Sequence, residues 1–357
     1  MSELLVGTKK GLFVLEGDAG GEFAIVTRAF EGLPVEYAMR DPRSGRLLAA
    51  LSSPFYGPKI FHSEDPAGEW EQASGVALPE GGEQALEKIW VIACGEADGL
   101  LYAGGDPGVL FESRDGGASW ELNAALWEQP SRAHWQPGGG GLCLHSIVTW
   151  PGDPQRLAVA ISAAGMWLTD DGGQSWRRGN DGIVPRYLPE EALADENAGR
   201  CVHHVERAPR RPERLFMQFH GGVYRSDDAG QSWVAVGDGL PSDFGFPLAV
   251  DPADPDSAFV IPLVADMDRV TPDGRVRVYE TRDAGASWSA RGDGLPAEHA
   301  YLTVLRQALA CCGEGPGLEL YFGATSGELF ASPDAGASWS TAALRLPPIY
   351  SVVALAG

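Results

Sequence analysis

The stretch SRDGGASW at residues 113–120 decides the architecture of this chain, because it recurs along the sequence. Four further copies keep the pattern Ser/Thr-x-Asp-x-Gly-x-x-Trp: TDDGGQSW from Thr169, SDDAGQSW from Ser226, TRDAGASW from Thr281 and SPDAGASW from Ser332. A sixth copy, SEDPAGEW from Ser63, keeps the hydroxyl, the aspartate and the tryptophan but moves its glycine to Gly68. Successive copies start 50 to 57 residues apart, a period that indicates a repeat architecture.

The residues of this motif predict a self-stabilised turn. The aspartate at its third place can accept hydrogen bonds from backbone N–H groups two residues on, and the glycine at its fifth place supplies a positive φ. The tryptophan begins the next strand and offers a flat apolar surface to a neighbouring repeat. Because the same carboxylate returns in every repeat, we expect it to serve folding rather than catalysis. These carboxylates are Asp65, Asp115, Asp171, Asp228, Asp283 and Asp334.

The motif resembles the Asp box of the BNR-repeat, sialidase-like β-propellers. Each repeat reads as four short strands, as in LLYAGGDPGVLFESRDGGASWEL at residues 100–122. At about 50 residues per repeat, a chain of 357 residues suits seven such units. We therefore predict an all-β, seven-bladed β-propeller that forms a single domain over residues 1–357.

The two ends of the chain predict how the ring closes. Residues 4–15, LLVGTKKGLFVL, read as the second and third strands of a blade whose inner strand is absent. Residues 349–355, IYSVVAL, read as an inner strand with no blade after it. We expect the C-terminal strand, residues 348–355, to complete the first blade and remove its open edge.

Composition excludes several classes of partner. The 49 acidic and 27 basic residues give a formal charge of -22, which repels nucleic acids and anionic bilayers. No stretch approaches the roughly 20 apolar residues of a spanning helix, and the N-terminus enters an alternating strand without a signal-like apolar region. The five cysteines are odd in number and lack C-x-x-C spacing, so neither a disulfide framework nor a structural zinc is predicted. A cytoplasmic protein is expected.

Three long connections stand out between or within the repeats. They are residues 123–141, residues 177–200, where LPEEALADENAG reads as a short capped helix, and residues 263–275, which read as a long hairpin. None of them lies on the turn that carries the box. We therefore expect them to gather on the opposite face, where function is expected because long loops on a rigid scaffold carry sites.

Five of the seven histidines fall between positions 134 and 220. Aligning the inner strands on the proline that follows them places Glu36, His145, His203 and Phe246 at equivalent positions near the channel mouth. The candidate catalytic residues are His145 or His203 as a base and Glu36 or Asp243 as an acid. Candidate ligand-binding residues are Tyr37, Arg40, Trp90, His134, Trp135, Arg200, His204, His220, Tyr301 and Arg306. Because adjacent strand residues alternate, His203 and His204 should face opposite sides.

The chemistry of this cluster stays open at the level of sequence. Neutral imidazoles can hold a divalent metal or act as acid and base, arginines can grip an anion, and aromatic rings can stack on a ligand. No H-x-H or H-x-x-x-H spacing assigns metal ligands, so no cofactor is predicted with certainty. The run Gly138 to Gly141 lacks the Lys-Ser/Thr of a phosphate loop and is interpreted as a hinge or a close-approach segment.

For a sialidase, the family resemblance implies an arginine triad that opens with Arg-Ile-Pro. This chain has no such motif, and Arg345-Leu346-Pro347 fills an ordinary Leu-Pro position, so sialidase activity is not expected. Two functions remain. The first is a pocket for a small polar or acidic ligand, acting on a glycoside by hydrolysis or elimination if it is an enzyme. The alternative is a non-catalytic assembly protein that holds a partner protein through its loop-bearing face.

Overall fold

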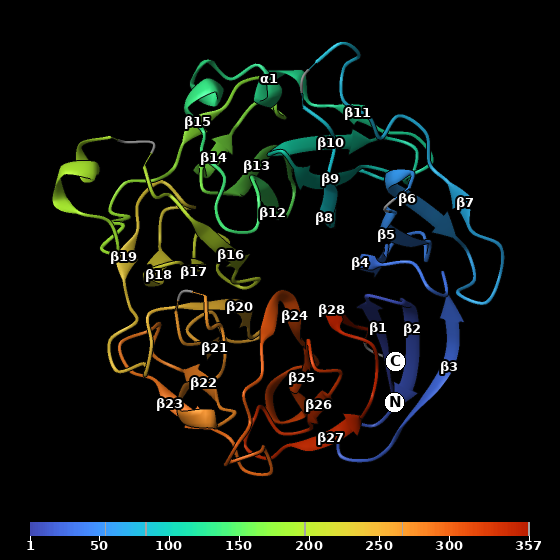
Figure 1. Ribbon diagram of the computed structural model, residues 1–357, viewed down its shortest axis with the longest axis vertical. Helices are drawn as coiled ribbons and strands as arrows, with labels where there is room; N and C mark the ends of the chain where they lie inside the picture. Colours follow the sequence, from blue (N-terminus) through green and yellow to red (C-terminus); the bar gives the residue numbers. More distant parts are fainter. Residues whose placement is uncertain (54, 83, 196–197, 266, 356–357) are drawn as a thin grey trace.

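The computed structural model describes residues 1–53, 55–82, 84–195, 198–265 and 267–355. Its regular structure is almost entirely antiparallel β-sheet, and the sheets stand around a common central axis (Figure 1). The helical elements are short: α1 (Ala124–Trp127), η1 (Pro130–His134), η2 (Glu190–Ala194), η3 (Pro272–Gly274) and η4 (Gly315–Gly317). Among the described residues, no helix combines the length and apolar composition that crossing a membrane requires. The predicted all-β class is confirmed.

Five sheets have four strands each, in chain order from the axis outward. They are β4 (Val35–Arg40), β5 (Leu47–Ser53), β6 (Gly57–Ser63), β7 (Glu71–Gln72); β8 (Lys88–Cys94), β9 (Leu101–Asp106), β10 (Val109–Ser113), β11 (Glu121–Leu122); β12 (Cys143–Trp150), β13 (Asp153–Ser162), β14 (Gly165–Thr169), β15 (Arg177–Arg178); β16 (Val202–Arg207), β17 (Leu215–Phe219), β18 (Gly222–Ser226), β19 (Val234–Ala235); and β20 (Gly245–Val250), β21 (Ala258–Pro262), β22 (Val278–Thr281), β23 (Ser289–Arg291).

One further sheet has eight strands and joins the two ends of the chain. Its order is β27 (Ser340–Ala343), β26 (Leu329–Ser332), β25 (Glu319–Ala324), β24 (Val304–Cys312), β28 (Ile349–Leu355), β1 (Ser2–Thr8), β2 (Gly11–Gly17) and β3 (Phe23–Ala29). β28 pairs antiparallel with β1 from Glu3 opposite Leu355 to Thr8 opposite Ile349, so the predicted pairing of the C-terminal strand is confirmed. Between β24 and β28, the described residues form a single parallel bridge, from Gln307 to Ser351.

The core lies between the faces of adjacent sheets. The strands nearest the axis pack in a cycle, β4 on β8 on β12 on β16 on β20 on β24 on β28 and back to β4. Between two of these sheets, Leu48 and Ala50 of β5 meet Leu101 and Ala103 of β9, and all four are fully buried. Since both faces of such a strand are covered, its sequence reads as an unbroken apolar run, LLAAL in β5.

The turns that carry the motif are held as predicted, with one difference. Asp115 accepts the N–H of Ser119 at 2.9 Å and its hydroxyl at 2.6 Å, while the Ser113 hydroxyl accepts the N–H of Gly117 at 2.9 Å. The same bonds recur at Asp171, Asp228, Asp283 and Asp334. The carboxylate thus reaches four residues on, because the glycine turn folds the chain back over it. Only in the sixth copy is the partner two residues on, Ala67 to Asp65.

Three tryptophans of the motif bond to the preceding repeat, whereas the other three donate to a carbonyl of their own turn. Trp233 donates its indole N–H to the carbonyl of Gly179 at 2.9 Å, and Trp176 donates to the side chain of Asn123 at 3.1 Å. Both rings are buried. The expected packing of the tryptophan against a neighbouring repeat is therefore present in these copies.

Two local predictions in the long connections are wrong. The segment expected to be a capped helix forms only the 3-10 turn η2, because Pro189 stands at its N-cap and has no side-chain acceptor. Residues 196–197 of that segment lie outside the described residues. The expected hairpin at 263–275 has no strand among its described residues. It turns through η3, and the Thr271 hydroxyl donates to the carbonyl of Ala300 at 2.5 Å, which fastens the loop to the segment before β24.

Candidate functional site

The inner strands share a β-bulge at one equivalent position. The register against the second strand shifts there, and the extra residue is left outside the ladder, which re-aims its side chain. The residues at these shifts include Glu36 in β4, Trp90 in β8, His145 in β12, His203 in β16 and Phe246 in β20. The proline alignment of the sequence thus located a true structural equivalence.

A pocket of about 400 Å³ lies at the end of the strands opposite the Asp turns. All three long connections contribute to its wall: residues 136–140 from the first, Tyr187, Leu188 and Gly199 from the second, and Met267 and Arg269 from the third. The antiparallel order places these connections at the strand ends away from the turns that precede β11, β15 and β23. The expected gathering of the insertions on that face is confirmed.

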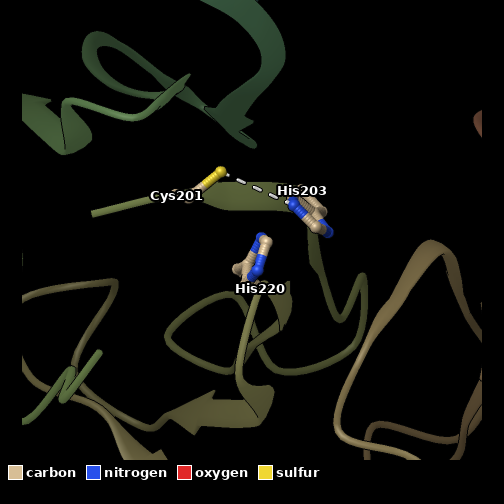
Figure 2. A group of neighbouring side chains, drawn as sticks. All are labelled: Cys201, His203 and His220. Atoms are coloured by element: carbon tan, nitrogen blue, oxygen red, sulfur yellow. Dashed lines mark hydrogen bonds between the residues drawn. The ribbon is translucent and has the colours of Figure 1, made fainter. Parts of the chain in front are cut away.

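Cys201, His203 and His220 converge inside this pocket (Figure 2). Their ligand atoms lie within 4.8 Å of one another, and Cys201 Sγ is 3.6 Å from His203 Nε2. The Nδ1 of His203 donates to the carbonyl of Gly245 at 2.6 Å, which leaves Nε2 as the acceptor that faces the thiol. Burial, and next the Arg306 guanidinium, keep the pKa of His203 well below its ordinary value, so this imidazole is neutral at pH 7.

Aromatic rings and two arginines complete the pocket. His220 lies between the rings of Tyr187 and Phe244, with centroids at 4.2 and 5.0 Å. Arg306 of β24 is 8% exposed and packs its guanidinium on the ring of Phe246, 4.8 Å from the centroid. Burial lowers the pKa of Arg306, yet an arginine stays charged at neutral pH. In the part of the chain that the structure describes, its Nε has no hydrogen-bond partner.

The glycine run passes directly over this cluster. A Cβ on Gly138 would lie 3.3 Å from Cys201 Sγ, and one on Gly139 would lie 3.1 Å from a terminal nitrogen of Arg269. Side chains at these two positions would press on the pocket residues. The interpretation of this run as a close-approach segment is confirmed.

His145, expected as a base, cannot take that part because both ring nitrogens are engaged. Nε2 donates to the carbonyl of Val202 at 2.8 Å, and Nδ1 lies 3.0 Å from the hydroxyl of Ser146. The ring is fully buried, and burial holds its pKa well below the ordinary value. Since the Val202 carbonyl stands between Cys201 and His203, His145 acts on the pocket by holding that segment in place.

A second cavity of about 310 Å³ occupies the central channel and takes another part of the predicted set. Tyr37, Arg40 and His204 line it together with His145. His204 Nε2 lies 3.2 Å from a carboxylate oxygen of Glu206 in the channel. His203 and His204 therefore face different cavities, as strand alternation predicted.

The remaining predicted residues lie beyond the lining of either cavity. Glu36 pairs with Lys88, Oε2 to Nζ at 3.0 Å, and Arg200 donates to the carbonyl of Ile183 at 2.6 Å. Trp135 is buried against Trp167, with centroids 5.2 Å apart, so it serves the core and not a stacking wall. His134, Asp243 and Tyr301 are exposed to solvent outside both cavities, and Trp90 stands beside Arg306, 5.5 Å from its guanidinium.

Among the pocket residues that sequence reasoning missed are the thiol, aromatic and cationic side chains of Cys201, Tyr187, Phe244 and Arg269. For Cys201 a signal existed, because Cys201 and His203 are separated by one residue at the start of a strand and so share a face. The other three lie in connections whose course the local sequence does not determine.

No family model matches the chain. An oligoxyloglucan reducing end-specific xyloglucanase from Emericella nidulans is 26% identical over 206 residues, which cover 50% of this chain and 24% of that protein. The chain thus spans about a quarter of this curated relative.

Two solved structures show the same fold. An ancestral GH74 enzyme matches with a TM-score of 0.56 and 16% identity, over 83% of this chain and 36% of that one. YCF48 bound to D1 peptide matches with a TM-score of 0.51 and 13% identity, over 86% of this chain and 80% of that one. At these identities the likeness concerns the fold alone. The chain is an all-β, propeller-like protein.

Proposed function

We propose that this chain is a single-domain Asp-box propeller of seven blades whose mouth pocket binds a small anionic ligand, with acidic sugars as the leading class. The five intact Asp turns support the Asp-box assignment, since each uses the same bonds. The blade count is supported by the single bridge between Gln307 and Ser351, at which the eight-stranded sheet divides into two sheets of four.

The buried guanidinium of Arg306 carries the proposal of an anionic ligand. A buried cation is costly unless an opposite charge approaches it. Arg306 is buried, and its Nε has no hydrogen-bond partner among the described residues. Arg269 lines the same pocket, and the described lining includes no Asp or Glu. In a chain with a formal charge of -22, a wall of this kind favours an anionic over a cationic organic ligand.

The same wall bears on the chemistry of a bound glycoside. Glycoside hydrolysis commonly uses two carboxyl groups on either side of the scissile bond. The described lining of the pocket supplies neither, and Glu36 is paired with Lys88 outside it. We therefore propose binding as the primary function and take xyloglucan, a neutral polymer, as a poor candidate for this pocket.

Calorimetric titration with galacturonate, and with galactose as the neutral match, tests the proposal. Galacturonate should bind and galactose should not. Arg306→Gln should weaken galacturonate binding roughly 10- to 100-fold, since a hydrogen bond to a charged group contributes about 1.5–3 kcal/mol. Arg114→Gln is the matched control, because Arg114 is 78% exposed on an Asp turn at the other face. Equal affinity for both sugars, or no loss in Arg306→Gln, would remove the proposal.

One observation favours the alternative of a partner protein. On the loop-bearing face, Phe55 and Tyr56 in the turn between β5 and β6 form an apolar patch and are 86% and 79% exposed. We propose an extended apolar peptide as the occupant of this patch. Peptides selected from a displayed library should lose binding to the double variant Phe55→Ser/Tyr56→Ser and keep binding to Arg306→Gln. The reverse pattern would exclude this function.

A further inference from the structure

We infer that Cys201, His203 and His220 bind one divalent transition-metal ion of the zinc class, with an open coordination position toward the pocket. The inference rests on these side chains and their supports, and it stands whether or not the pocket takes an acidic sugar. Figure 2 shows the three side chains turned toward one another from β16 with its preceding residue and from the turn between β17 and β18.

The distances suit a tetrahedral ion. With metal–sulfur and metal–nitrogen bonds of about 2.3 and 2.05 Å, a sulfur and a nitrogen ligand lie about 3.6 Å apart. Cys201 Sγ and His203 Nε2 are 3.6 Å apart, and His220 completes a triangle with every side within 4.8 Å. On metal binding, the sides of the triangle that involve His220 would close from at most 4.8 Å toward this separation.

Hydrogen bonds to His203 and to the backbone beside it determine which ring nitrogen is available to bind a metal. Metal-binding histidines usually donate their second ring nitrogen to an oxygen, which selects the tautomer. His203 does so through Nδ1 to the Gly245 carbonyl at 2.6 Å. The Val202 carbonyl, between the two ligands on the strand, accepts from His145 at 2.8 Å and from the Ser162 hydroxyl. The backbone that carries Cys201 and His203 is therefore held from the adjacent sheet.

The donor set selects the metal and the purpose of the site. One thiolate and two imidazoles prefer zinc, cobalt or copper over magnesium and calcium, which require oxygen ligands. Three protein ligands leave one position for a ligand, whereas structural zinc sites use four. A divalent ion with one thiolate has a net charge of +1, beside Arg306 and Arg269 in the same pocket. An anion is the natural fourth ligand.

The same geometry also permits another use, in which His203 activates Cys201 as a nucleophile without a metal. The two uses differ in what zinc does to the thiol. A bound ion shields the sulfur from alkylation, whereas a metal-free pair reacts with an alkylating agent at the same rate in the presence or absence of zinc.

The test uses the full chain, stripped with a chelator, desalted and titrated with Co²⁺ without added sugar. We expect one ion per chain, with a thiolate-to-cobalt charge-transfer band and the visible bands of a tetrahedral site. Cys201→Ser should abolish the charge-transfer band, and His203→Gln and His220→Gln should each weaken binding by at least roughly 10- to 100-fold. Cys143→Ser and His134→Gln are matched controls, since Cys143 bonds to the Gly140 carbonyl and His134 is exposed outside the cluster.

Alkylation of Cys201 by iodoacetamide, followed by mass spectrometry, gives a second readout on the unaltered chain. Zinc should slow the reaction at least tenfold and a chelator should restore it, which needs no variant to fold. A Co²⁺ complex without a charge-transfer band, binding unchanged in Cys201→Ser, or alkylation indifferent to zinc would each overturn the inference. Sugar titrations with and without zinc then report separately on the anion proposal.

Discussion

Ile349 is the residue through which the closure of the fold can be measured. It lies at the start of β28, is fully buried, and faces Gly323 of β25, where a Cβ would come within 2.5 Å of its side chain. Since the neighbouring backbone cannot collapse inward without moving β25, Ile349→Ala should leave a cavity. Isoleucine-to-alanine changes of this kind cost about 2–5 kcal/mol.

The expected shift in melting temperature follows from the size of the chain. At about 2.1 cal/mol/K per residue, the unfolding entropy of 357 residues is about 0.75 kcal/mol/K, so the loss corresponds to roughly 3–7 °C. Differential scanning calorimetry measures it. Ile25→Ala in β3 of the same sheet is the control, because Ile25 is 50% exposed, and it should move the transition by about 1 °C or less. Equal shifts in the two variants would refute the view that the C-terminal strand is a buried part of the closed core.

Three other predictions concern the turns, the support of the pocket and its entrance. Hydroxyl and N–H donors, first the Ser175 hydroxyl, lower the pKa of Asp171 to about 2. The stability that these bonds contribute is present above the ordinary carboxyl pKa near 3.9 and is lost as the pH falls toward 2. Melting curves of wild type and Asp171→Asn should therefore differ at pH 6 and converge near pH 2. His145 becomes protonated below about pH 6.5 in the unfolded chain, whereas burial keeps it neutral in the folded chain. This group should therefore lower the free energy of unfolding by up to about 1.4 kcal/mol per pH unit as the pH falls. Urea denaturation between pH 7 and 5 should show a smaller loss of stability in His145→Gln than in wild type. Gly138→Val should close the pocket over Cys201 and abolish ligand binding in calorimetry, whereas Gly140→Ala, whose Cβ meets no atom closer than 4.0 Å, should bind normally.

The sequence was sufficient to predict the features that depend on local turn chemistry and on how strands repeat along the chain. The spacing of the Asp turns, the apolar strand of residues 349–355 and the proline alignment each predicted a feature found in the structure. His145 and His203 show where such reasoning ends. They hold equivalent bulge positions, yet a carbonyl of the next sheet occupies the Nε2 of His145, whereas the Nε2 of His203 faces Cys201 and the pocket.

Tertiary contacts decided the other differences. Trp135 reads as an exposed aromatic in a glycine-rich loop, but η1 turns it onto Trp167 in the core. Arg269 reaches the pocket because the third connection folds across the mouth and not outward as a hairpin. The residue pattern within one connection does not indicate which neighbouring segment that connection will pack against.

The repeated bulge of the inner strands has an evolutionary consequence. A side chain outside the hydrogen-bond ladder contributes little to strand pairing, so substitution there leaves the register of the sheet intact. Around one rim this chain carries glutamate, tryptophan, histidine and phenylalanine at such places. Substitutions at these bulge positions can therefore change the residues around the rim one sheet at a time without altering the strand pairing of the fold.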